Sequence, residues 1–201
     1  MTPLELIELN IRLEYSLDEA GLLVPFTGST EQARFIIYRY EGGYATFFHH
    51  ALPEFIKAQI MALPREQAFG DHEAIKRLLA MQTPCRKMWI GGACYFAKLP
   101  LRGGFLDALH EDNHWVIKVD GDIAAQAWTV RGNDRAAEAA VETRPEFQRR
   151  GYGRQVTAAW AHDVMSWGLV AFYSYHRDNV ASQALAKSLG LMKYADGVAY
   201  D

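Results

Sequence analysis

A short basic loop between a predicted strand and a predicted helix constrains the fold of this chain more than any other feature. Residues 144–154 contain four arginines and one glutamate, although the whole chain has a net charge of −3. Gly151 and Gly153 allow the backbone to turn tightly and to approach a ligand closely. The helix that begins near Arg154 points its positive dipole end at the same place. This order of strand, basic glycine loop and helix predicts an anion site, for which a pyrophosphate is the expected ligand.

The elements around the loop predict an α/β or α+β domain with a mixed central sheet flanked by helices. After the loop, apolar residues such as Val156, Trp160 and Val164 share one helical face, and Gly168 ends the helix. The strand that follows is almost continuously apolar, as is typical of a buried strand. The predicted elements here are strands at 114–119, 123–130, 136–143, 169–175 and 191–200, the last broken at Asp196 and Gly197, and helices at 154–167 and 179–189.

The first hundred residues predict an N-terminal α+β extension. Its expected elements are helices at 4–13, from Pro53 and at 71–81, and a hairpin at 34–48. Pro100, Gly103 and Gly104 then interrupt the pattern. We therefore divide the chain into a segment of residues 1–105 and a core of residues 106–201.

Composition excludes several classes of protein. Half of the 201 residues are hydrophobic and 22% are charged, which excludes a mainly disordered chain. The slight excess of acidic residues argues against a nucleic-acid partner, and no run of 18 apolar residues predicts a membrane helix. The N-terminus carries acid where a secretion signal needs positive charge. Cys85 and Cys94 lack CxxC spacing, and His49 and His50 lack metal-ligand spacing. We expect a cytoplasmic protein with two buried thiols and no metal.

The spacing of residues in the basic loop argues against two known pyrophosphate-binding loops. A P-loop requires GxxxxGK followed by serine or threonine, and the basic loop contains no lysine. The dinucleotide fingerprint requires a third glycine at position 156, where this chain has Val156. Both patterns fit poorly.

The hexamer from Gln148 to Gly153, QRRGYG, instead resembles the Q/R-x-x-G-x-G/A loop of the GNAT superfamily, the acetyl-CoA-dependent N-acetyltransferases. Pro145 precedes it, a helix follows it, and Asn179 begins the next helix after a strand. The segment from Ala181 and Ser182 to Leu189-Gly190-Leu191 is similar to N-x-A-S…LGF in this superfamily. The resemblance covers roughly residues 90–201, and it is to a bacterial subgroup of mostly unassigned substrate.

This resemblance implies a GNAT fold and acetyl-CoA as the co-substrate. The pyrophosphate would rest on the loop backbone, the pantetheine arm would bond along the end of the preceding strand, and divergence of strands 136–143 and 169–175 would admit the thioester. Asn179 would bond the pantetheine chain or a nearby carbonyl. The cofactor-binding residues it implies are Val141, Glu142, Thr143, Gln148, Arg149, Arg150, Gly151, Tyr152, Gly153, Arg154, Asn179 and Ser182.

Two carboxylates are candidates for the base that removes a proton from the amine. Glu138 and Glu142 lie four residues apart on one strand, so they share a face of the sheet. Acids on a central apolar strand are costly unless they are paired or hydrated. The alternative is therefore that one of them pairs with a loop arginine such as Arg150 or Arg154. Either glutamate, or both, could act as the base.

The general acid is less defined. Many GNAT enzymes have a tyrosine seven residues after the helix-capping asparagine, and here that position is Ala186. Tyr175, which we place with Glu138 and Glu142 among the catalytic candidates, is one replacement. His176, Ser182, Tyr173 and a water molecule are others.

The resemblance thus implies an acyltransferase that moves acetyl from acetyl-CoA to a small-molecule or peptide amine by direct attack in a ternary complex. Residues 1–105 would shape the acceptor side. One alternative is a CoA-binding sensor or scaffold that has lost catalysis, and another is an acyltransferase for a longer acyl-CoA. The sequence leaves the acceptor and the choice between monomer and homodimer open.

Overall fold

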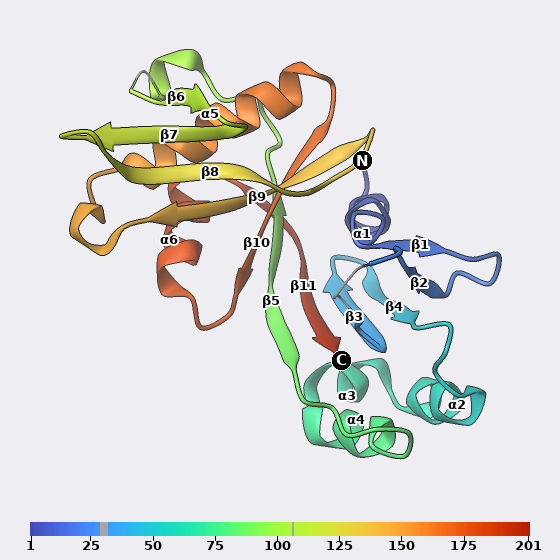
Figure 1. Cartoon of the computed structure of the whole chain (residues 1–201). Coiled ribbons are helices and arrows are strands. Elements are labelled where there is room, and N and C mark those ends of the chain that lie inside the picture. The colour runs from blue at the N-terminus through green and yellow to red at the C-terminus, as the bar shows by residue number, and fades with distance from the viewer. Residues whose placement is uncertain (29–31, 106) are drawn as a thin grey trace. The chain divides into compact units, whose positions relative to one another are not determined.

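The computed structural model describes residues 1–28, 32–105 and 107–201, and the chain divides into two compact units (Figure 1). Unit 1 consists of Met1–Gly92 and Tyr194–Asp201, and unit 2 of Ala93–Lys193. The chain leaves unit 1 within strand β5 (Met88–Tyr95) and returns within strand β11 (Met192–Tyr200).

Unit 1 packs helices against strands in the order β4-β3-β11-β5, in which β3 is antiparallel to both β4 and β11. Its other elements are α1 (Pro3–Ile11), β1 (Tyr15–Leu17), β2 (Leu23–Pro25), β3 (Phe35–Tyr40), β4 (Gly43–Phe48), α2 (Glu54–Ala62), α3 (Arg65–Gly70) and α4 (His72–Leu79). Phe35 and Tyr200 from the sheet pack with Ile56 and Leu79 from the helices. The predicted hairpin and the three predicted helices are confirmed, while α3 and the β1-β2 pair were not expected.

The last strand is continuous, so the predicted break at Asp196 and Gly197 is wrong. Asp196 and Gly197 pair with Arg39 and Tyr38 of β3. A Cβ at Gly197 would lie 2.7 Å from the ring of Tyr38. The glycine therefore makes room for an aromatic ring on the neighbouring strand and does not end the strand.

Unit 2 contains a mixed sheet in the order β10-β9-β8-β7-β6, in which β9 and β10 are parallel and the other pairs antiparallel. Its elements are a 3₁₀ turn at Arg102–Gly104, β6 (Leu109–Glu111), β7 (His114–Val119), β8 (Asp122–Gly132), β9 (Ala136–Thr143), a 3₁₀ turn at Pro145–Phe147, α5 (Tyr152–Ser166), β10 (Val170–His176) and α6 (Val180–Ser188). The predicted α/β class with a mixed sheet flanked by helices is confirmed.

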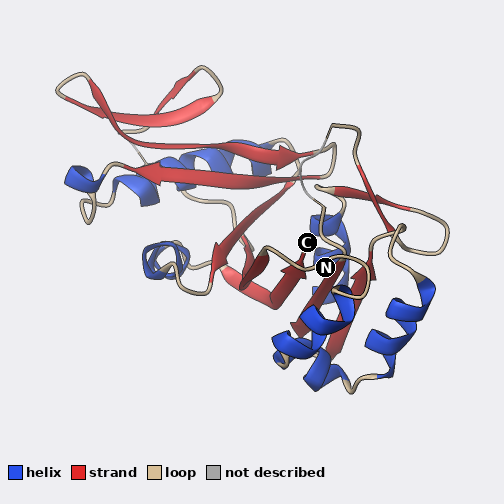
Figure 2. Cartoon of the chain, turned by 60° about the horizontal axis from the view of Figure 1, so that its bottom comes forward, coloured by secondary structure: helices blue, strands red, loops and turns tan. Residues whose placement is uncertain are grey.

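Small side chains bring α5 close to the sheet of unit 2. Buried alanines on β8 and β9, such as Ala127 and Ala137, pack with Val156, Ala159 and Trp160 of the helix. The indole N–H of Trp160 also donates to Thr129 Oγ1 at 2.9 Å. Figure 2 shows α5 running along one face of these strands. The opposite face of β9 carries Glu138.

The compact units divide at residues 92/93 and 193/194, whereas the boundary predicted from the sequence is at 105/106. The last strand joins unit 1 because it pairs with β3, a contact between segments far apart in the chain. The roles expected of the two halves stay predictions.

Cys94 is buried, but Cys85 is only partly buried, so the expectation of two buried thiols is wrong for Cys85. Burial and the neighbouring Asp201 raise the pKa of Cys85 to about 11. Its thiol is therefore almost fully protonated at neutral pH. In the described ranges, no helix is long and apolar enough to cross a membrane. No group of histidine, cysteine, aspartate or glutamate side chains suited to a metal ion occurs among the described residues either.

Candidate functional site

The basic loop presents unpaired backbone N–H groups at the start of α5. Arg149 and Gly151 have left-handed backbone angles, with φ of 63° and 81°. Gly151 precedes the first helical residue, and no side chain caps this helix end. Among the residues that the structure describes, no acceptor is found for the N–H groups of residues 149–154. These donors and the helix dipole favour an anion at the loop.

Of the four arginines of the loop, Arg144 lies 3.8 Å from the carboxylate of Asp122, whereas the other three are not neutralised by carboxylates. Within the described part of the chain, no carboxylate lies within ion-pair distance of Arg149, Arg150 or Arg154. Arg154 Nε instead donates to the carbonyl of Ser188 at 3.2 Å, and the guanidinium of Arg150 lies 5.4 Å from the ring centre of Phe147. The charge of these side chains is therefore available to a bound anion.

The backbone at Gly153, the second glycine of the loop, lies close to the side chain of Thr143. A Cβ at Gly153 would lie 2.9 Å from Oγ1 of Thr143, the last residue of β9. The carbonyl of Gly153 also accepts from Thr157 Oγ1 at 2.6 Å, and Gln148 Nε2 reaches the carbonyl of Thr143 at 3.4 Å. Because Gly153 has no side chain, the first turn of α5 can pack closely against the end of β9.

We expect Gly153→Ala to lower the free energy of unfolding by about 1 kcal/mol, because the new methyl group and the Thr143 hydroxyl must move apart. Urea unfolding of four proteins tests this: wild type, Gly153→Ala, Thr143→Ala and the double variant. In the Thr143→Ala background the same glycine substitution should cost nothing. An equal cost in both backgrounds would show that the contact with Thr143 is not the reason.

Strands β9 and β10 diverge beside this loop. Their parallel pairing joins Val170 to Ala136, Ala171 to Ala137 and Phe172 to Glu138. In the described chain no pairing between them follows, although β9 continues to Thr143 and β10 to His176. The predicted divergence is confirmed. It leaves the backbone of residues 139–143 open on the side of β10, which suits an extended ligand that bonds like a strand.

Glu138 lies at the point of divergence and is 2% exposed. Its Oε2 is 3.1 Å from Arg131 Nε and 2.9 Å from Arg131 Nη2, and its Oε1 accepts from the hydroxyl of Ser174. One carboxylate therefore joins β8, β9 and β10. The alternative in which an acid pairs with a loop arginine such as Arg150 or Arg154 is wrong for Glu138, since its partner comes from the neighbouring strand.

A β-bulge explains this partner. Between Thr129 and Arg131 the register of β8 against β9 shifts by one residue, so Arg131 lies opposite Glu138. Without the shift, alternation from Gln126 would place Val130 on that face. The signal in the sequence is Gly132, because an isolated glycine within a strand often marks a bulge.

Glu142 has a different environment on the same face. It is exposed, and its Oε2 accepts one hydrogen bond from Gln126 Nε2 at 2.9 Å. It lies in the part of β9 that has no partner in β10. Its carboxylate can therefore meet solvent or a ligand, whereas that of Glu138 is fully engaged.

Hydroxyl groups lie on β10 and α6. Tyr173 Oη and Ser182 Oγ are 2.5 Å apart, and Tyr173 is buried. Burial raises the pKa of Tyr173, although the hydrogen bond with Ser182 opposes this. Tyr175 is partly buried two residues further along the strand. Ala186 is buried in α6, one turn after Ser182.

Asn179 caps α6. Its Oδ1 accepts from the backbone N–H of Ser182 at 2.9 Å, which leaves its Nδ2 as a donor. His176, at the end of β10, accepts through Nδ1 from the backbone N–H of Asp178 at 3.3 Å. The predicted cofactor and catalytic residues thus occur on three successive parts of unit 2: the end of β9, the loop with the start of α5, and the segment from β10 to α6.

Comparison with known proteins gives a family match over this region. Residues 118–198 match the model of a family described as FR47-like protein. No curated protein matches the chain.

Solved structures of low sequence identity are also similar. An acetyltransferase from the GNAT family of Novosphingobium aromaticivorans is 18% identical, with 58% of this chain and 65% of that chain covered, at a TM-score of 0.49. An acetyltransferase from the GNAT family of Colwellia psychrerythraea is 8% identical, with 78% and 75% covered, at 0.47. A GCN5-related N-acetyltransferase-like protein from Streptococcus suis is 15% identical, with 88% and 87% covered, at 0.47. This chain thus spans less than two thirds of the Novosphingobium protein.

Proposed function

We propose that the chain is an acyltransferase of the GNAT type that transfers an acetyl group from acetyl-CoA to an amine, and the match of residues 118–198 to the FR47-like family supports this. One observation carries the proposal. A loop with free N–H groups and three arginines that no carboxylate neutralises in the described residues lies between a strand that diverges from its parallel neighbour and the helix that follows. This arrangement suits a ligand with a pyrophosphate at one end and an extended amide chain behind it, which is the chemistry of CoA.

We assign the binding of acetyl-CoA to three groups of residues. The pyrophosphate accepts from the N–H groups of residues 149–154 and from the side chains of Arg149 and Arg150. The pantetheine arm bonds along Val141–Thr143, on the open edge of β9. Asn179 Nδ2 is free to donate to a carbonyl of the same arm.

The carboxylates of Glu142 and Glu138 have different roles in this proposal. The amine attacks the thioester carbonyl, and its proton passes to Glu142 directly or through one water molecule, because Glu142 is exposed and held by a single hydrogen bond. Glu138 is a positioning residue that holds the diverging strands. As the C–S bond breaks, the CoA thiolate takes a proton from a hydroxyl group. Tyr175 and the Tyr173–Ser182 pair are the two candidates.

A second candidate function is a CoA-binding sensor or scaffold without turnover. Ala186 favours it, because the superfamily's usual proton donor is a tyrosine at this position. Both functions require that CoA binds. They differ in whether an amine causes release of the CoA thiol.

Thermal unfolding with acetyl-CoA, CoA, ATP and NAD tests the proposal. A ligand at 100 times its dissociation constant adds about 2.7 kcal/mol, which for a chain of this size raises the melting temperature by roughly 5–10 °C. We expect this rise with acetyl-CoA and CoA only, and a much smaller rise in the variant Arg149→Gln/Arg150→Gln. No rise with either CoA ligand would overturn the proposal, and an equal rise with ATP and NAD would reduce it to a general anion site.

A further inference from the structure

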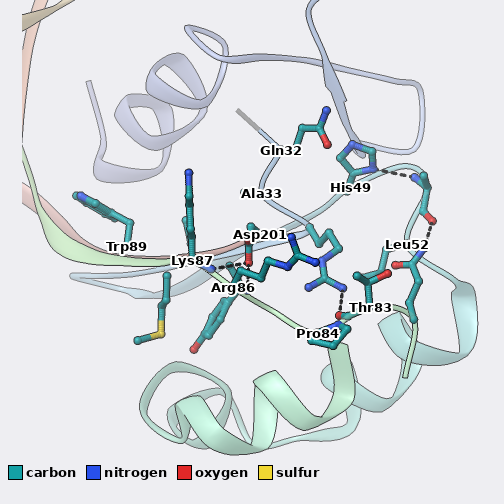
Figure 3. Close-up of a pocket in the computed structure, with 16 residues that line it drawn as sticks. Gln32, Ala33, His49, Leu52, Thr83, Pro84, Arg86, Lys87, Trp89 and Asp201 are labelled. Carbon is teal, nitrogen blue, oxygen red and sulfur yellow. Dashed lines mark hydrogen bonds between the residues drawn. The ribbon is translucent and has the colours of Figure 1, made fainter. Parts of the chain in front are cut away.

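Unit 1 contains a cavity of about 1200 Å³, and none of the residues assigned above to acetyl-CoA or to proton transfer lines it (Figure 3). It lies where β3 and β5 begin and where β4 and β11 end, and all of its lining residues belong to unit 1. Ligand sites commonly measure about 300–1000 Å³, so this cavity is large enough for an organic molecule of nucleotide size. We propose that it binds a small organic anion with at least two negative charges.

The charged lining residues favour an anion. Arg34, Arg86 and Lys87 line the cavity, and among its described lining residues Asp201 has the only carboxylate side chain. One oxygen of Asp201 already accepts from the backbone N–H groups of Arg86 and Lys87, at 2.7 and 2.9 Å. Within the described part of the chain, no ion pair joins a carboxylate to any of the three cationic side chains.

The geometry directs these cations to the cavity. In Figure 3 the side chain of Arg86 crosses the middle of the pocket, while Lys87 stands beside it next to Trp89. Arg34 Nη1 donates to the carbonyls of Leu79 and Thr83, at 3.1 and 2.7 Å, which fixes its guanidinium. A fixed guanidinium loses little freedom when its other N–H groups bind an anion.

His49 adds a neutral hydrogen-bond donor to the three cationic side chains of the cavity. His49 Nδ1 accepts from the backbone N–H of Ala51 at 3.0 Å, so in the neutral ring the proton is on Nε2. Burial, and then the charges of His50 and Lys57, lower the pKa of His49, which favours this neutral form. The cavity thus offers hydrogen-bond donors of two kinds, cationic and neutral, and both suit carboxylate or phosphate oxygens.

The apolar part of the lining indicates that the ligand is organic. Trp89 and Met88 are among the lining residues, and both are partly buried. A Cβ at Gly197 would lie 3.1 Å from the ring of Trp89, so the indole is packed on β11 and held in place. A rigid aromatic wall beside cationic donors fits an anion attached to a carbon skeleton better than a bare inorganic ion.

Isothermal titration calorimetry with two probes, citrate and tripolyphosphate, tests this site. We expect at least one probe to bind the wild-type protein at millimolar concentrations or below. We expect Arg86→Gln/Lys87→Gln to weaken that binding by about tenfold or more, since each lost charge removes a charge-assisted hydrogen bond. The probe that binds more tightly identifies the anionic group as carboxylate or phosphate.

Because the basic loop of unit 2 is itself proposed to bind a pyrophosphate, all titrations are repeated in the Arg149→Gln/Arg150→Gln background, which weakens that second site. In this background the probe should still bind, and Arg86→Gln/Lys87→Gln should still weaken the binding. Arg65→Gln/Arg77→Gln is the matched control, because it removes the same charge from unit 1 outside the cavity, and it should weaken binding by no more than about twofold. Absence of binding in this background, or an equal loss in Arg86→Gln/Lys87→Gln and in the control, would overturn the proposal. Because acetyl-CoA is not used, the result is independent of the proposed acetyl transfer.

Discussion

Replacing Glu138 with alanine is expected to lower the free energy of unfolding by about 2–4 kcal/mol, because it removes the buried carboxylate that accepts from the partly buried side chain of Arg131. Breaking a fully buried pair costs about 3–5 kcal/mol, and we expect less here since the Arg131 side chain is 28% exposed. The substitution also removes the acceptor of the Ser174 hydroxyl, so β8, β9 and β10 lose their common contact. The corresponding fall in melting temperature is about 5–15 °C.

Urea unfolding followed by circular dichroism measures this loss. Glu138→Gln keeps the volume and an acceptor for Ser174 but removes the negative charge, so we expect an intermediate effect. Glu146→Gln is the matched control, because Glu146 is exposed, and it should change stability by less than about 0.5 kcal/mol. If Glu138→Ala is as stable as this control, the carboxylate does not hold the three strands together.

Glu142→Gln should lower the rate of acetyl transfer about 100-fold or more, because an amide cannot take the proton from the attacking amine. The side chain is exposed and accepts one hydrogen bond, from Gln126, so the substitution should leave folding unchanged. The rise in melting temperature with acetyl-CoA should also be unchanged. The measurement is release of the CoA thiol with an amine found by screening.

Glu146→Gln again provides the control, since it removes an acid from the adjacent 3₁₀ turn and should keep the wild-type rate. A Glu142→Gln protein that works at the wild-type rate would remove this residue as the base. If the wild-type protein binds CoA but no amine causes thiol release, the sensor or scaffold function is supported. Substitution of Glu138 should therefore affect mainly the stability of the protein, and substitution of Glu142 mainly the rate of acetyl transfer.

The chemistry of the basic loop followed from residues that are neighbours in the chain. Gly151 has the left-handed conformation that a glycine adopts most readily, and the helix begins directly after it. Alternation along β9 places Glu138 and Glu142 on one face. Backbone sterics and side-chain periodicity act over a few residues, so these features can be inferred from the sequence. The binding and catalytic roles of these residues stay predictions.

The partner of Glu138 and the cavity of unit 1 depend on contacts between distant segments. The bulge in β8 decides that Arg131 faces Glu138, and a shift of one residue would turn that side chain to the other face. The residues that line the cavity come from four segments, within 32–34, 49–52, 82–89 and 199–201, and the last of these joins the others through the pairing of β11 with β3. The alternating pattern of a strand fits many partners and registers equally well. Packing of the whole chain selects one of them, and so tertiary structure alone determines where these charges meet.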